Sequence, residues 1–188
     1  MNAFTGEVLW LAGYAKLRAE GLQTGTSESG PFLPRILKVN ARGPASPVVG
    51  DEVVVLAPKD AAGVIAFDRR NGEIRWRQDL LECRYLAGVC EGNLLAVDNT
   101  VTALSLATGK VAWEYTVEGK RLLGQPGYSG AVLYLPTQTN LQMVDARTGQ
   151  ALGTFAWDQK AGPLGNLVIG SQRIVGVNTK ALAALAAK

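Results

Sequence analysis

The sequence predicts an all-β protein, a β-propeller of four-stranded antiparallel blades with about four blades in the chain. Three observations lead to this fold class. A short phrase, a turn ending in Gly followed by an apolar residue and an aromatic one, occurs four times. The glycines of this phrase recur at blade-sized intervals, and short β-rich runs lie between them. A recurring unit of this kind indicates an array of equivalent supersecondary pieces.

The phrase occupies residues 4–10, 68–76, 106–113 and 145–152. Its Gly follows Thr or Asn and supplies the positive φ that a tight hairpin needs. In three copies a Trp stands four residues after the Gly, where it begins an outer strand and can pack between blades. In the fourth copy Gly153 occupies that position, so its contact with a next blade is in question.

The spacing of the phrase sets the size of the repeat. Gly72, Gly109 and Gly149 follow one another at intervals of about 40 residues, which is the length of one four-stranded blade. The interval from Gly6 to Gly72 is too long for one blade and too short for two. We therefore expect a short helical or loop insertion near residues 11–45, with a short helix over 10–20 as one possibility.

Between the glycines lie runs of four or five β-branched or apolar residues, bounded by Gly, Pro, Asn or Asp. They cover residues 52–56, 63–67, 93–97, 101–104, 131–135 and 141–144. This pattern is typical of strands joined by hairpins. The sequence thus predicts one domain over 1–188, with blades at 46–82, 83–119 and 120–160 and a partial blade at 161–188.

The two ends of the chain complement each other. Residues 1–10 read as an outer strand without inner strands, whereas 166–170, 173–177 and 181–185 read as three inner strands without an outer one. We expect residues 1–10 to close the last blade, because such closure leaves no exposed sheet edge. The Ala and Leu content of residues 181–188 favours a helix instead, which would weaken this closure.

The phrases Ala66-Phe67-Asp68…Gly72…Trp76 and Ala103-Leu104-Ser105…Gly109…Trp113 resemble the tryptophan-docking repeat of quinoprotein-type (PQQ-like) β-propellers. The resemblance covers residues 1–10 and about 46–177. It implies that the Trp of one blade docks on the turn of the next blade. The blade-docking residues it implies are Gly6, Trp10, Gly72, Trp76, Gly109, Trp113 and Gly149.

The resemblance also bears on assembly and location. The family is usually eight-bladed, so three arrangements stay open: a four-bladed ring, two chains that close one eight-bladed ring as a homodimer, or a segment of a longer protein. The family implies a periplasmic or otherwise extracytoplasmic location. The N-terminus of this chain lacks the basic stretch and apolar core of a signal peptide.

Composition excludes several function classes. The chain contains no His, which rules out a His-based triad and a His-ligated zinc site. Its net charge of +3 is small and dispersed, so we expect no nucleic-acid binding. No apolar run approaches the roughly 20 residues that span a bilayer. Cys83 and Cys90 either form one bridge or remain reduced, and we favour a buried free thiol for Cys90.

No catalytic residue or metal ligand can be assigned from the sequence. Cys83 and Cys90 are not adjacent, and no position matches the catalytic Asp or the calcium ligands of quinoprotein dehydrogenases. We therefore predict a non-catalytic scaffold that binds a protein partner, without a cofactor. The alternative is part of a quinoprotein dehydrogenase that binds pyrroloquinoline quinone (PQQ) and calcium at the propeller axis. A purely structural spacer is a third possibility.

Overall fold

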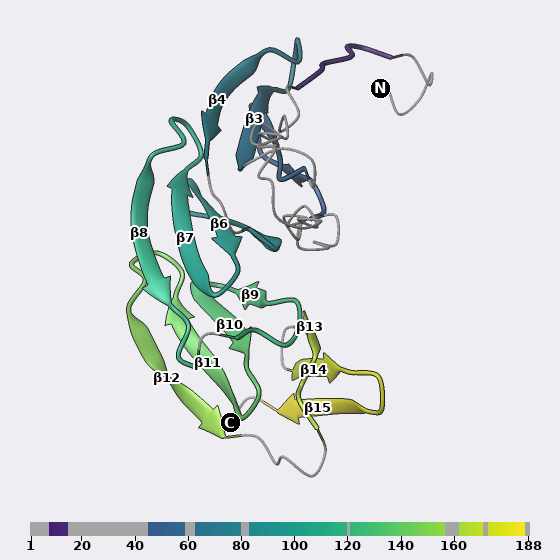
Figure 1. Ribbon diagram of the computed structural model, residues 1–188, viewed down its shortest axis with the longest axis vertical. Helices are drawn as coiled ribbons and strands as arrows, with labels where there is room; N and C mark the ends of the chain where they lie inside the picture. The colour runs from purple at the N-terminus through teal and green to yellow at the C-terminus, as the bar shows by residue number, and fades with distance from the viewer. Residues whose placement is uncertain are drawn as a thin grey trace, which may run out of the picture.

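A computed structural model describes residues 8–14, 45–58, 63–79, 83–119, 121–156, 162–170 and 173–186. Their regular structure is entirely β: four antiparallel sheets in which strands adjacent in the chain are adjacent in space (Figure 1). This confirms the predicted class. Within these residues, no helix is long and apolar enough to cross a membrane.

The bounds of the strands follow sheet by sheet. The first sheet consists of β1 (Val48–Val49), β2 (Val53–Leu56), β3 (Val64–Asp68) and β4 (Ile74–Gln78). The second consists of β5 (Tyr85–Cys90), β6 (Asn93–Val97), β7 (Thr100–Ser105) and β8 (Val111–Thr116). The third consists of β9 (Gly127–Ser129), β10 (Val132–Pro136), β11 (Asn140–Asp145) and β12 (Ala151–Ala156). The fourth has three strands, β13 (Asn166–Ile169), β14 (Arg173–Val177) and β15 (Leu182–Ala186).

The C-terminal segment forms a strand, not the helix that its composition favours. β15 pairs with β14 from Arg173↔Ala186 to Val177↔Leu182. The helix preference of Ala and Leu over other residues is worth only tenths of a kcal/mol per residue. Pairing with β14 and packing of Leu185 against the cluster of Leu141, Leu164 and Leu167 outweigh it.

Part of the predicted insertion lies outside the described residues. Residues 11–14 have no regular secondary structure, and 15–44 are not described. The described part of this segment covers the first sheet: Ala12 and Tyr14 pack against Ile65 and Phe67, which are 0% and 2% exposed.

The four sheets follow one another along an arc, as blades do in a propeller (Figure 1). The last strands of the first three sheets, β4, β8 and β12, lie along the convex edge. The first strands lie at the inner side, where β5 contacts both β1 and β9, and β9 contacts β13. Each blade is therefore followed by its neighbour in the chain around a common centre.

The hydrophobic core is divided among the junctions between blades. Between the first and second sheets, Val55 and Val64 pack with Leu94 and Leu104. Between the second and third, Leu95 and Val97 pack with Leu133, Leu135 and Val144. A smaller cluster, Leu141, Leu164 and Leu167, joins the third and fourth. Since both faces of an inner blade are covered, its central strands are apolar almost throughout.

The described sheets form an open arc, with residues 8–14 beside the first sheet at one end and β15 in the fourth sheet at the other (Figure 1). The expected closure of the last blade by residues 1–10 stays a prediction, because most of this segment lies outside the described residues. Residues 8–10 form no strand and β15 pairs with β14 alone among the described residues, while residues 1–7 are not described. Val168 and Leu182 on the last sheet are 62% and 72% exposed.

The core between the second and third blades should dominate stability. Leu133→Ala removes a side chain that is 0% exposed, and we expect a loss of about 3 kcal/mol in the free energy of unfolding. Leu152→Ala, on a residue 52% exposed, should change it by less than about 0.5 kcal/mol. Urea denaturation measures both. Equal losses would contradict the assigned core.

Candidate functional site

Adjacent blades are joined by a Trp that lies on the turn of the next blade. The Trp10 Nε1 donates a hydrogen bond to the Arg69 carbonyl oxygen at 2.8 Å. The Trp76 Nε1 donates to the Leu106 carbonyl oxygen, also at 2.8 Å. Arg69 and Leu106 occupy the same position of their turns, so one contact geometry recurs at two junctions.

Each Trp ring lies directly over a glycine. The φ angles of Gly72, Gly109 and Gly149 are 75°, 72° and 75°, in the left-handed region that favours glycine. A Cβ added at any of the three would lie 2.6 Å from the Cε3 atom of Trp10, Trp76 or Trp113, respectively. Glycine is therefore required both by the backbone conformation and by the space that the indole occupies.

The docking contact weakens toward the C-terminal end. Trp113 lies on Gly149, but its buried Nε1 has no hydrogen-bond partner among the described residues. In the next copy Gly153 replaces the Trp, and β12 is exposed along its whole length. Gly6 lies outside the described residues. The indole-to-carbonyl bond itself could not be read from the sequence, because it joins a Trp to a turn 30 residues away.

The two requirements on Gly109 can be separated by mutation. Gly109→Ala should lose about 1 kcal/mol from the positive φ and about 2 kcal/mol more from the collision with Trp76. Gly92→Ala is the matched control, since Gly92 has φ 77° and nothing within 4 Å of an added Cβ; it should lose only the first amount. Urea denaturation gives both values, and similar losses would rule out the docking role of Gly109.

The carboxylates at the docking turns serve the turns themselves. The Asp68 carboxylate accepts from the Arg70 backbone N–H at 2.8 Å and pairs with Arg75 at 2.7 Å. Asp145 accepts from the Arg147 backbone N–H at 2.8 Å and pairs with its side chain at 2.7 Å. The Arg147 side chain, with this N–H, lowers the pKa of Asp145 to about 2. Both groups are thus ionised structural acids at neutral pH.

Asp145 should contribute to the acid stability of its turn. Because its folded pKa lies below the ordinary 3.8, its stabilisation is present above pH 3.8 and is lost as pH falls toward 2. Arg147→Met should raise the pKa of Asp145, measured by NMR titration of its carboxyl carbon. The stability difference between the native protein and R147M should shrink from pH 5 to pH 2.5. A difference that grows over this range would contradict the pairing.

A second set of connections lies at the end of each blade that is away from its docking turn. Thr116, at the end of β8, pairs with Thr100, at the start of β7. The β8–β9 connection therefore lies at the end of the blade away from the docking turn. The β10–β11 turn lies at this same end, since Pro136 pairs with Leu141. The molecule thus has a docking-turn face and a face formed by these connections, here called the connection face.

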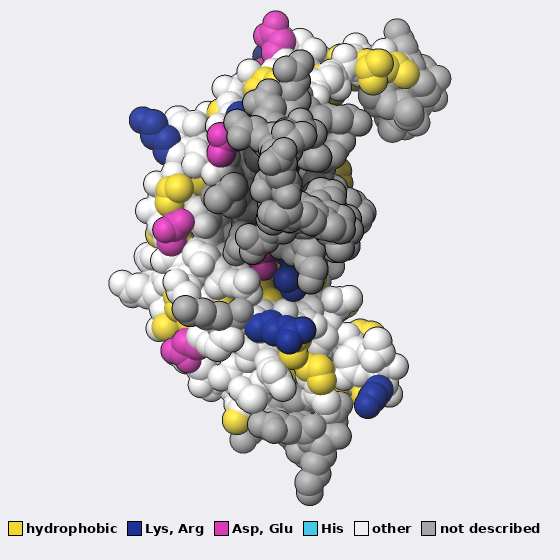
Figure 2. Space-filling model, viewed as in Figure 1, with side chains coloured by type: hydrophobic (Ala, Val, Ile, Leu, Met, Phe, Trp, Pro, Cys, Tyr) yellow, Lys and Arg dark blue, Asp and Glu magenta, His cyan; other side chains and the backbone are white. Residues whose placement is uncertain are grey.

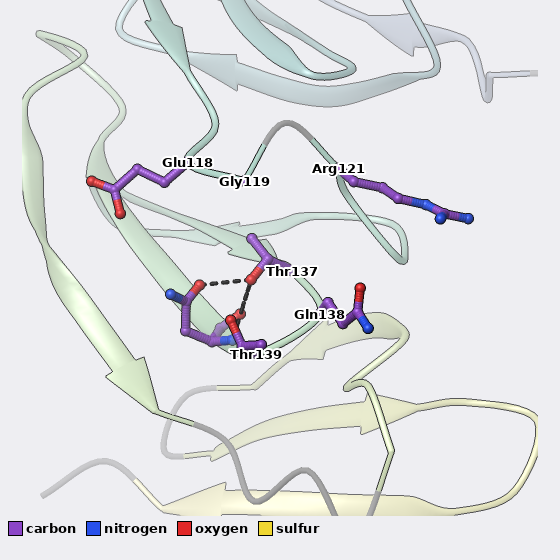
Figure 3. Close-up of a pocket in the computed structure, with 7 residues that line it drawn as sticks. Glu118, Gly119, Arg121, Thr137, Gln138 and Thr139 are labelled. Atoms are coloured by element: carbon purple, nitrogen blue, oxygen red, sulfur yellow. Dashed lines mark hydrogen bonds between the residues drawn. The ribbon is translucent and has the colours of Figure 1, made fainter.

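A polar groove of about 350 Å³ opens on the connection face between the second and third blades (Figure 3). It is lined by Glu118, Gly119, Arg121, Thr137, Gln138, Thr139 and Asn140. The Arg121 and Gln138 side chains extend to the same side of the groove, whereas Glu118 extends to the other. The groove therefore combines one cation and one anion with amides and hydroxyls.

The walls of the groove are held by hydrogen bonds. The Gln142 side chain, 1% exposed, donates to the Glu118 carbonyl oxygen at 2.9 Å and accepts from the Glu118 N–H at 3.1 Å. The Thr137 hydroxyl donates to the Asn140 side-chain oxygen at 2.6 Å, and the Asn140 N–H lies 3.2 Å from that hydroxyl. These bonds fix both connections before any ligand arrives, so binding costs little ordering.

At the preceding junction, Arg84 lies 3.6 Å from the buried Asp98 carboxylate. The Arg84 N–H bonds to the Val97 carbonyl oxygen as the Leu123 N–H bonds to that of Pro136, so Leu123 and not Arg121 occupies the position equivalent to Arg84. Thr137 takes the place of Asp98 in the next blade. Arg121 is exposed and forms no ion pair with any residue that the structure describes.

Calcium is bound by several oxygen ligands gathered at one point. These residues contain no group of three or more His, Cys, Asp or Glu side chains that could hold a metal ion. Cys83 and Cys90 are buried in two different core clusters, and burial raises the pKa of Cys90. The part of the chain that the structure describes therefore does not fit the ligand set of calcium, and no chemical step through these groups is derived.

Known proteins place the chain among β-propellers of one family. The PQQ_2 family model, described as outer membrane protein assembly factor BamB, matches residues 1–178. BamB from Moraxella catarrhalis is similar in structure with TM-score 0.61 and 17% identity, over 76% of this chain and 46% of that chain. The computationally designed Ika4 protein gives TM-score 0.61 and 17% identity over 78% of this chain and 92% of that one.

A third solved structure is an enzyme. Quinohemoprotein alcohol dehydrogenase from Comamonas testosteroni gives TM-score 0.56 and 18% identity, over 72% of this chain and 29% of that chain. The matched region thus spans less than half the length of both natural proteins. At these identities the structural likeness shows the fold alone. No curated protein sequence matches the chain.

Proposed function

Because the chain belongs to the PQQ_2 family, described as outer membrane protein assembly factor BamB, we propose that it is a non-catalytic propeller module that binds a protein partner. The observation that carries this proposal is the polar groove on the connection face. Its rim is fixed by the Gln142 and Thr137 hydrogen bonds, yet the Arg121 guanidinium on that rim has no ion pair among the described residues.

The groove suits a loop of a partner protein. A volume of about 350 Å³ lies at the lower end of the range for ligand sites and admits a few side chains. Arg121 can donate two parallel hydrogen bonds to one carboxylate, and the neighbouring Gln138 and Thr139 offer both donors and acceptors. We propose that the bound loop is polar and carries an Asp or Glu opposite Arg121.

Family membership supports a location outside the cytoplasm. BamB is described as an outer membrane protein assembly factor, and we propose an extracytoplasmic, periplasmic setting for this chain as well. Its partner would then be another protein of the cell envelope. We propose no nucleic-acid partner, since the net charge is only +3.

The partner surface can be located by site-specific photo-crosslinking in cells. A photoreactive residue at Gln138, in the groove, should give a discrete crosslinked product. The matched control is Thr108, an exposed residue on the docking-turn face, which should give none. Arg121→Glu should reduce the Gln138 product about tenfold or more, because a like charge would face the partner carboxylate. Products at Thr108 alone would overturn the proposed surface.

The enzyme alternative has its own test. Under the proposed function, titration of the protein with PQQ and calcium should produce no saturable spectral change. Dye reduction should stay at the level of PQQ and calcium without protein. A saturable change accompanied by dye reduction would establish a quinoprotein and replace the proposed function.

A further inference from the structure

We propose that the polar groove recognises a loop with charges of both signs, which places an acidic residue opposite Arg121 and a basic residue opposite Glu118. This partner chemistry rests on the proposed function, because it assumes a protein loop in the groove. Three observations support it: opposite charges at opposite sides of the groove, a fixed backbone beneath the acidic one, and uncharged lining residues between them.

The first observation is the separation of the two charges. Figure 3 shows the Glu118 and Arg121 side chains extending to opposite sides of the groove. Figure 2 shows acidic side chains along the convex side of the arc and basic side chains at the inner side of its middle part. Among the described residues, Glu118 and Arg121 form no ion pair, either with each other or with a third residue. The groove therefore has an acidic side and a basic side.

The second observation is the fixed backbone at Glu118. Its N–H and its carbonyl oxygen both bond to the Gln142 side chain, at 3.1 and 2.9 Å. The Tyr115 hydroxyl donates to the same Gln142 oxygen at 3.1 Å. The preceding residue, Val117, is 0% exposed, and its N–H bonds to the Asn99 carbonyl oxygen. The exposed Glu118 carboxylate is therefore carried by a backbone that is already ordered, which lowers the cost of binding.

The third observation is that the other residues lining the groove carry no charge. They are Gly119, Thr137, Gln138, Thr139 and Asn140. The Thr137 hydroxyl donates to the Asn140 side-chain oxygen at 2.6 Å, so these two polar groups already bond to each other within the wall. Among the lining residues, selection of a partner by charge therefore depends on Glu118 and Arg121 alone.

A loop that carries both charges satisfies both sides of the groove. Its carboxylate accepts two parallel hydrogen bonds from the Arg121 guanidinium, and its basic group forms an ion pair with the Glu118 carboxylate. A loop with two acidic residues would instead bring one of them near Glu118, and like charges across an interface are unfavourable. Electrostatic complementarity of this kind fixes the register of a partner and excludes wrong partners.

The first test extends the photo-crosslinking at Gln138 in cells. Glu118→Lys should reduce the Gln138 product about tenfold, because a like charge would face the basic residue of the loop. The matched control is Glu114→Lys, on an exposed acidic residue of β8 that does not line the groove. This control should leave the product unchanged, and circular dichroism checks that both variants fold.

The outcomes of this test separate the two proposals. A product that is unchanged by Glu118→Lys but lost with Arg121→Glu overturns the need for a basic residue in the loop and leaves the proposed function standing. Equal losses with Glu118→Lys and Glu114→Lys also overturn it, because net charge alone would then explain the effect. Absence of any Gln138 product from the native chain overturns the proposed partner surface itself.

The second test uses three blocked peptides as probes: Glu-Gly-Gly-Gly-Lys, Glu-Gly-Gly-Gly-Glu and Lys-Gly-Gly-Gly-Lys. NMR titration of the full chain follows the Gln138 and Thr139 backbone amides. The mixed-charge peptide should bind about threefold more tightly than either of the others. Glu118→Lys should shift the preference to the diacidic peptide, Arg121→Glu to the dibasic one, and the double variant should restore the first preference. A preference that ignores these reversals, or no saturable shift with any peptide, overturns the proposal without changing the crosslinking result.

Discussion

The contact on which the structure depends is the packing of a Trp ring on a turn glycine of the next blade. Trp76 on Gly109 joins the outer strand of one sheet to the hairpin of its neighbour, and the hydrogen bond to Leu106 fixes the ring orientation. Because every contact joins consecutive repeats, the fold behaves as a linear array in which each blade is stabilised chiefly by its neighbours. The apolar clusters between sheets stabilise the same junctions from within.

Much of this architecture could be predicted from the sequence. The turn glycines and the β-branched runs encode local geometry, so strands such as Asn93–Val97 fall where expected. The state of Leu182–Ala186 could not be settled, because the helix preference of Ala and Leu opposes the place of this segment after β14. Whether residues 1–10 close the last blade could not be settled from the sequence either, because this depends on how two segments distant in the sequence lie in space.

The candidate groove could not be predicted for a different reason. Arg121 and Gln138 come from two separate connections, and neither stands in a recognisable motif. At this junction Leu123 and Thr137 occupy the places of the ion pair Arg84–Asp98 of the preceding junction. Such a difference becomes visible only when equivalent positions are superposed on the fold. Gln142 carries no sequence signal at all, because a buried amide that holds a connection resembles any other strand residue.

The two faces of the arc are therefore under different constraints. On the docking-turn face, a substitution at Gly109 or Trp76 disturbs the contact between two blades. The ion pair of Asp145 and Arg147 on this face stabilises its own turn. On the connection face, the backbone is held by Gln142 from beneath, so exposed residues such as Gln138 can change without affecting a joint. Under the proposed function, a partner specific to this protein binds at the connections, where the repeats are free to differ from one another.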